Sequence, residues 1–129
     1  MIKKLIAVII FILSFAEANN IKTVESTLLH GVTFNMSKIE HIVTFSDDDC
    51  IYTGIARNQI GLGRVFVKLN KKSCFVNNKV VEQKISGFVV DEDETGGMSA
   101  DESFKDLGYY ATLKPFKKVK LVISIVNTQ

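Results

Sequence analysis

Residues 50–74 read CIYTGIARNQIGLGRVFVKLNKKSC, and the cysteines at the two ends of this stretch are the only ones in the chain. From Arg64 to Leu69 the residues alternate between small apolar side chains and charged or aromatic ones, which is the two-residue period of a β-strand. Glycines and polar residues fill the middle of the stretch, as is typical of a turn. The pattern therefore predicts a β-hairpin that brings Cys50 and Cys74 together.

The start of the chain resembles a secretory signal peptide. Lys3 and Lys4 form a positive region, an apolar run covers residues 5–15, and a small-x-small motif, Ala-Glu-Ala, follows it. We expect residues 1–18 to be a signal peptide and residues 19–129 to form a single β-rich domain. The alternative is an uncleaved N-terminal anchor, although a membrane-spanning helix usually needs about 20 apolar residues.

An exported chain meets oxidising conditions, in which Cys50 and Cys74 can form a disulfide. The bond would close a loop of about 25 residues and contribute about 3.5 kcal/mol in the chain-entropy model. The alternative is a redox or metal-binding pair. Such pairs usually have the spacing Cys-x-x-Cys, whereas these cysteines are far apart and flanked by strand residues. The spacing favours a structural disulfide.

The charge and motif content argue against several functions. Without residues 1–18 the chain would be close to neutral, so we expect no nucleic-acid partner and no electrostatic membrane binding. His30 and His41 have no recurring acidic partner, and the residues 61–63, Gly-Leu-Gly, lack the rest of a phosphate-binding loop. We therefore expect a protein that is not an enzyme and has no small-molecule substrate.

Short runs of Val, Ile, Thr, Phe and Tyr recur between turn residues, which predicts an all-β fold, either a β-sandwich or an open β-barrel-like domain. Asn77-Asn78 predicts a tight hairpin turn, because asparagine tolerates positive φ. The expected strands are residues 21–29, 39–45, 50–56, 64–69, 73–76, 79–85, 87–90 and 117–126.

The segments between these strands receive different predictions. Residues 57–59 are expected to form a loop together with Gly61 and Gly63, and residues 70–72 are a polar stretch between the expected strands 64–69 and 73–76. Residues 91–102 are expected to form a solvated acidic loop, and residues 103–110 a helical turn. A group of lysines near the end of the chain predicts a solvated face or a protected sheet edge: Lys114, Lys117, Lys118 and Lys120.

The acidic segment also has a spacing close to that of a calcium-binding EF-hand loop, with Gly96 at the turn position. The residues at the ligand positions would be Asp91, Asp93, Thr95, the Gly97 carbonyl, Ser99 and Glu102. Threonine is a weaker ligand than aspartate, and the preceding residues 87–90 predict a strand where an EF-hand has a helix. We therefore expect no cofactor, with calcium as the alternative.

Three segments together resemble a known family: residues 49–56, which begin Asp-Cys and include Gly54, residues 63–69, which read Gly-Arg-Val-Phe-Val-Lys-Leu, and residues 72–74, Lys-Ser-Cys. They are similar to the C-terminal domain of the TraB/TrbI family, the scaffold proteins of conjugative type IV secretion systems. The similarity continues to the turn at Gly96-Gly97 and covers roughly residues 29–97. The chain departs from the family in lacking its proline-rich stalk, and the likeness fades after Gly97.

The resemblance implies a β-barrel-like domain with an assembly role, in which the acidic turn is structural. The expected function is a non-enzymatic periplasmic component of a type IV secretion apparatus, whose partners are other subunits in the envelope. Self-association and association with the outer membrane are further expectations. The alternative is a small extracytoplasmic binding or inhibitor domain, periplasmic or secreted, that calcium stabilises.

Overall fold

The computed structural model describes residues 21–59, 63–104 and 107–126, and the expected signal peptide lies outside these ranges. Within them the regular elements are all strands. They are β1 (Ile21–Leu28), β2 (Val32–Phe34), β3 (Glu40–Ser46), β4 (Cys50–Gln59), β5 (Arg64–Val76), β6 (Lys79–Val90), β7 (Met98–Ser99), β8 (Glu102–Phe104), β9 (Leu107–Leu113) and β10 (Lys118–Ile125). The prediction of an all-β fold is confirmed. No helix in the described part of the chain has the length and apolar character needed to cross a membrane.

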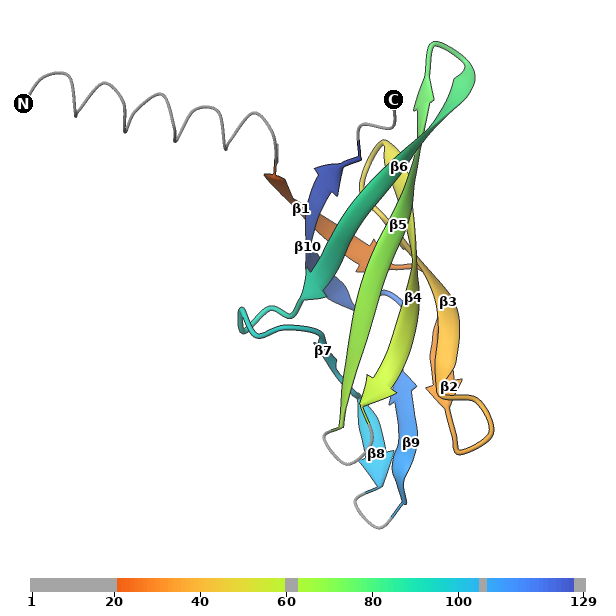
Figure 1. Cartoon of the computed structure of the whole chain (residues 1–129), viewed down its shortest axis with the longest axis vertical. Helices are drawn as coiled ribbons and strands as arrows, with labels where there is room; N and C mark the ends of the chain where they lie inside the picture. Colours follow the sequence, from red (N-terminus) through yellow and green to blue (C-terminus); the bar gives the residue numbers. More distant parts are fainter. Residues whose placement is uncertain (1–20, 60–62, 105–106, 127–129) are drawn as a thin grey trace, which may run out of the picture.

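The large sheet closes on itself. Its strands follow the order β4-β3-β1-β10-β6-β5, with β7 beside β5, and an additional pairing joins β4 to β5. The pairings around this ring are antiparallel. The shortest pairing in the ring is between β1 and β3, which share only the pairs Thr27 with Ser46 and Leu28 with Phe45. The fold is therefore a closed ring of strands with one weak seam (Figure 1).

The inside of the ring is filled by alternate side chains of each strand, as expected for a small barrel. In β4 the buried positions alternate through Tyr52, Gly54, Ala56 and Asn58. The largest completely buried side chains come from many strands: Tyr52, Phe34, Phe45, Leu28, Leu69, Met98, Leu113 and Leu121. Burial of these side chains holds the ring together, because strands that pair around a common interior share one apolar core.

A smaller sheet, in the order β2-β9-β8, lies at one end of the molecule (Figure 1). The prediction of a helical turn at residues 103–110 is wrong, since β8 and the first part of β9 occupy this stretch, with residues 105–106 outside the described ranges. The physical reason is the pairing of Ala111 and Leu113 with β2, which buries both side chains. Local helix preference is weak compared with such burial.

The long hairpin is more regular than the sequence predicted. Residues 57–59 continue β4 by pairing with the start of β5, and Asn58 turns its side chain into the interior. Residues 70–72 lie within β5, which joins the expected strands 64–69 and 73–76 into one, whereas the loop expected at residues 57–59 is wrong. Both segments are polar, but residues 57–59, Lys71 and Lys72 pair with neighbouring strands, which satisfies their backbone groups, and Asn70 is left as an irregularity of the ladder.

The lysines near the end of the chain do not protect a sheet edge. Lys118 and Lys120 belong to β10, which lies between β1 and β6 in the middle of the large sheet. Lys117 forms an ion pair with Asp101 at 3.4 Å, and Lys120 forms one with Glu94 at 3.5 Å. The prediction of a solvated face suits these residues, but the prediction of an edge is wrong.

Candidate functional site

The most distinctive surface feature is the end of the β5–β6 hairpin, residues 71–84, which we call the arm. The arm extends beyond the rest of the ring (Figure 1). The tip is the predicted turn, in which Asn77 and Asn78 have φ of 50° and 61°. Two successive residues at positive φ are typical of a type I′ hairpin turn, so the prediction from Asn77-Asn78 is confirmed.

A β-bulge at the base of the arm sets the register of the cysteines. Below the bulge Gly54 pairs with Leu69, and above it Thr53 pairs with Lys71, so Asn70 is the extra residue of β5. In a regular ladder continued from Gly54 and Leu69, Cys50 would stand opposite Ser73. The bulge shifts the register by one residue and places Cys74 opposite Cys50 instead. Both cysteines then lie on the same face of the sheet.

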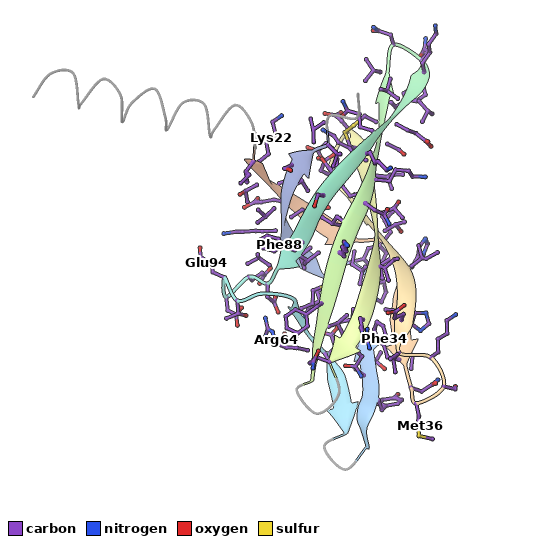
Figure 2. The ribbon with its side chains drawn as sticks, in the orientation of Figure 1. Lys22, Phe34, Met36, Arg64, Phe88 and Glu94 are labelled. Atoms are coloured by element: carbon purple, nitrogen blue, oxygen red, sulfur yellow. A yellow bond between two sulfur atoms is a disulfide. The ribbon has the colours of Figure 1, made fainter. Side chains whose placement is uncertain are left out.

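The disulfide between Cys50 and Cys74 joins directly opposite residues of β4 and β5, with Cα atoms 4.2 Å apart. The predicted bond is therefore confirmed. Figure 2 draws it among the strands at the base of the arm. A disulfide of this kind is typical of a protein in an oxidising, extracytoplasmic compartment. The bond holds the arm to β4 near the last backbone contact between them, the hydrogen bond from Phe75 N to Asp49 O at 3.4 Å.

The turn that leads into β4 is rigid because Asp47 accepts three hydrogen bonds. Its Oδ1 accepts from the backbone N–H groups of Asp49 and Cys50, at 2.9 and 2.7 Å, and its Oδ2 accepts from the Tyr52 hydroxyl at 2.8 Å. Burial raises the pKa of Asp47, but these hydrogen bonds outweigh it and hold the pKa below its ordinary value. Burial and the same carboxylate raise the pKa of Tyr52. The base of the arm is thus fixed on the β4 side.

Large apolar side chains stand in solvent along the arm. Phe75 is 64% exposed and Val80, its cross-strand partner, is 65% exposed. Val76 and Val81 are also exposed, and by the alternation of a strand they lie on the opposite face. Figure 2 shows side chains standing out on both sides of the arm's end. Contiguous exposed apolar surface in a soluble domain usually marks a place where another molecule binds.

The arm is also basic. It carries four lysines, Lys71, Lys72, Lys79 and Lys84, against one acidic residue, Glu82. Glu82 lies 3.7 Å from Lys71, in a pair that is exposed to solvent and therefore weak. The sequence alone did not predict this surface. The turn at Asn77-Asn78 and the valines that flank it were the available signal, but a strand pattern does not reveal whether its side chains are covered.

The predicted calcium-binding residues are only partly brought together. Asp91 Oδ2 accepts hydrogen bonds from the backbone N–H and the hydroxyl of Ser99, each at 2.8 Å. Asp93 bonds with Thr95 within its own turn. Burial raises the pKa of Asp91, but the hydrogen bonds from Ser99 and Glu92 more than offset it and leave the pKa lowered. Both carboxylates are therefore already used as hydrogen-bond acceptors that fix the segment.

A cation of the protein lies at the same turn. Arg64 donates from Nε to the Gly96 carbonyl at 2.8 Å and from Nη2 to the Thr95 hydroxyl (Figure 2). The Gly97 N–H donates to Val89 O at 2.8 Å, and Glu102 begins β8. In the described part of the chain, three or more His, Cys, Asp or Glu residues do not gather in a metal-binding arrangement. Calcium binding stays a prediction, and an ion near Thr95 would face the Arg64 guanidinium.

The segment from Asp91 to Glu102 is not simply a solvated loop. Met98 is 0% exposed and belongs to the core, as a strand residue that pairs with Val65. Gly97 has φ of 79°, and a Cβ atom there would lie 2.7 Å from Val65 O. Only glycine suits this conformation and this close approach. The prediction of a fully solvated loop is therefore wrong, because the acidic residues form a surface turn whose return strand is buried.

A cleft of about 490 Å³ lies near the β1–β3 seam. Its charged lining residues are Glu25, Asp47, Asp48, Glu92, Lys118 and Lys120. Four carboxylates and two ammonium groups line the cleft, so its lining has an excess of negative charge. Of the two histidines considered for chemistry, His41 contacts the Thr33 carbonyl through Nε2 at 2.7 Å and packs edge-on against Phe34. These contacts are structural.

No protein-family model matches this chain, and no curated protein matches it.

Proposed function

We propose that this protein is a non-enzymatic, extracytoplasmic protein-binding module that acts in the assembly of a larger complex. The observation that carries the proposal is the arm, whose apolar residues Phe75, Val76, Val80 and Val81 are exposed at the end of an anchored hairpin. Full burial of such a side chain contributes about 1.5–3 kcal/mol of favourable free energy relative to leaving it in water. A partner that covers them would recover part of this energy.

The anchoring of the arm supports the same proposal. Binding costs less when the binding element is held in one conformation before the partner arrives. The disulfide of Cys50 with Cys74 and the Asp47 hydrogen bonds hold the base of the arm. The type I′ turn at Asn77-Asn78 holds its tip. The arm is thus a rigid, apolar projection, which suits recognition and assembly.

The narrower proposal is a periplasmic component of a type IV secretion or conjugation apparatus. Its support is the resemblance across residues 29–97, a stretch that includes β4, β5, β6 and therefore the whole arm. The partners would be other subunits of the apparatus in the envelope, with self-association and contact with the outer membrane as further possibilities of the same proposal. The disulfide is in keeping with this location.

The test is site-specific photo-crosslinking from position 80 in cells, followed by identification of the linked proteins. We expect cross-links to envelope assembly subunits, lost in a Phe75→Ala, Val81→Asp double variant that leaves position 80 for the cross-linker. The matched control is Phe116→Ala, which removes an apolar side chain that is 72% exposed but lies away from the arm. Cross-links that persist in the arm variant, or that disappear equally in the control, contradict the proposal.

The second candidate is a small extracytoplasmic binding or inhibitor domain that calcium stabilises. The observation in its favour is that Asp91 and Ser99, two of the predicted ligands, are in contact. If calcium binds, millimolar calcium raises the melting temperature of the wild type and not that of Asp93→Asn. An unchanged melting temperature rules out calcium stabilisation. Cross-linking to an extracellular target, with no assembly subunit among the products, would favour this candidate over the first.

A further inference from the structure

The outer edge of β6 in the arm has no neighbouring strand among the described residues. β10 pairs with β6 from Ile85 to Val90, and one more hydrogen bond joins Val126 N to Lys84 O at 3.1 Å. Beyond Lys84 the other edge of β6 still pairs with β5, up to Val76 and Lys79. Residues 79–83 of β6 are therefore paired with β5 along one edge, and their other edge is open among the described residues.

The backbone groups that point to the open side can be assigned. The Lys84 carbonyl faces β10, as its bond to Val126 shows. Backbone groups alternate in direction along a strand, so those of Glu82 and Val80 face the same way, past the end of β10. The backbone groups of Lys79, Val81 and Gln83 face β5. The open edge therefore offers the N–H and C=O groups of Val80 and Glu82.

We infer that this edge of the arm accepts an extended segment of a partner protein as an added β-strand, and that the segment carries acidic side chains alternating with apolar ones. The inference rests on the proposed function and names how the arm binds and what it binds. Strand addition uses main-chain hydrogen bonds for affinity and side chains on the two faces for selection. One face of the arm presents Phe75 and Val80 to such a strand, and the opposite face presents Val76 and Val81.

The charge of the arm decides the chemistry of the partner. Lys79 and Lys84 stand on β6 at the two ends of the open stretch, and the single acidic residue, Glu82, forms an ion pair with Lys71 of β5, so acidic side chains beside this edge are attracted. The same lysines act against a second copy of the chain as the occupant. Pairing two copies through β6 would place two basic arms side by side, and like charges on adjacent strands are destabilising. A foreign acidic strand is therefore the favoured occupant.

The probe for this inference is a synthetic peptide of alternating glutamate and valine, compared with its lysine–valine counterpart. We expect the protein to bind the acidic peptide at least about tenfold more tightly than the basic one. Amide exchange followed by NMR should show the Val80 and Glu82 amides exchanging fast in the free protein and slowly with the acidic peptide. Equal binding of the two peptides, or slow exchange of both amides without peptide, overturns the inference.

The decisive variant is Glu82→Pro, with Glu82→Ala as its matched control. Both remove the side chain and its ion pair with Lys71, but only proline removes the N–H on the open edge. We expect Glu82→Pro to weaken acidic-peptide binding by about fivefold or more relative to Glu82→Ala, as the loss of a hydrogen bond implies. Circular dichroism and thermal melting check that both variants fold. Equal binding by the two variants overturns strand addition.

The two proposals fail in different ways. If cross-links from position 80 survive in Glu82→Pro but are lost in Phe75→Ala, Val81→Asp, the arm binds through its side-chain faces, so the proposed function stands and strand addition is wrong. If position 80 gives no cross-links while the acidic peptide still binds in the predicted manner, the proposed assembly role fails, although the open edge of β6 can accept an added strand. Each result assigns the failure to one proposal.

Discussion

Removing the disulfide should destabilise the folded protein by a large fraction of its total stability. The bond joins residues separated by 24 positions, so it restricts a loop of about 25 residues in the unfolded chain. The chain-entropy model gives about 3.5 kcal/mol for such a loop. A domain of ordinary stability has about 5–15 kcal/mol in total. The native ladder already places Cys50 opposite Cys74, so most of the effect comes from the unfolded state.

The assay is thermal and urea unfolding of the protein with and without reductant. We expect reduction to lower the melting temperature by roughly 10–20 °C, from 3.5 kcal/mol and the usual entropy of unfolding for a domain of this size. The urea m-value should rise, because the unfolded chain without the cross-link exposes more surface. A thiol assay confirms that the bond is broken.

The control for this experiment is Cys50→Ser, Cys74→Ser. This variant should melt near the temperature of the reduced wild type, and reductant should not change it. A fall of less than about 3 °C in fully reduced wild type, with the m-value unchanged, would refute the reasoning. That result would mean that the ladder between β4 and β5 constrains the chain equally in both redox states.

Three further predictions concern the acidic segment and its return strand. Met98→Ala should lower the free energy of unfolding by about 2–5 kcal/mol in urea titration, because Met98 is completely buried, and a near-neutral result would mean that the segment is solvated after all. Gly97→Ala should cost about 1–3 kcal/mol, because a Cβ at φ of 79° meets Val65 O, and an unchanged midpoint contradicts this. The folded-state pKa of Asp91 is lowered, so its contribution to stability is complete above about pH 4 and is lost as the pH falls through the folded pKa. Asp91→Asn should therefore be less stable than the wild type at neutral pH, with a smaller loss of stability on acidification, and parallel pH profiles of the two proteins would be evidence against this role.

Local pattern was enough to predict much of the fold and one element of the site. The alternation from Arg64 to Leu69 is the alternation of buried and exposed positions in β5. The Asn77-Asn78 turn has the expected backbone conformation. The disulfide also followed from the sequence, because an exported chain with two cysteines in facing strands has a chemical reason to cross-link. These features depend on near neighbours in the chain.

The errors share a different cause. Residues 103–110 and 57–59 have weak local preferences. Residues 57–59 become strand by pairing with the start of β5 and, at Arg57, with Glu40 of β3. β9, which begins within residues 103–110, pairs further along with β2, which is distant in sequence. Met98 lies in an acidic stretch, and nothing in its neighbours indicates that β5 will pair with it. Long-range pairing can override weak local preference because burial of a large side chain exceeds the propensity differences.

The sequence by itself determined the all-β character, the disulfide and the tip of the arm, because each depends on side-chain alternation, on turn chemistry or on the identity of two cysteines. Only the tertiary structure decided that the sheet closes into a ring and that β10 lies between β1 and β6 within it. It also decided that β6 extends beyond the described residues of β10. The open edge of the arm is a consequence of the last of these. Among the described residues it exists because the pairing of β10 with β6 reaches as far as Val126. An unpaired edge is a property of neighbouring strands, which no residue of β6 encodes alone.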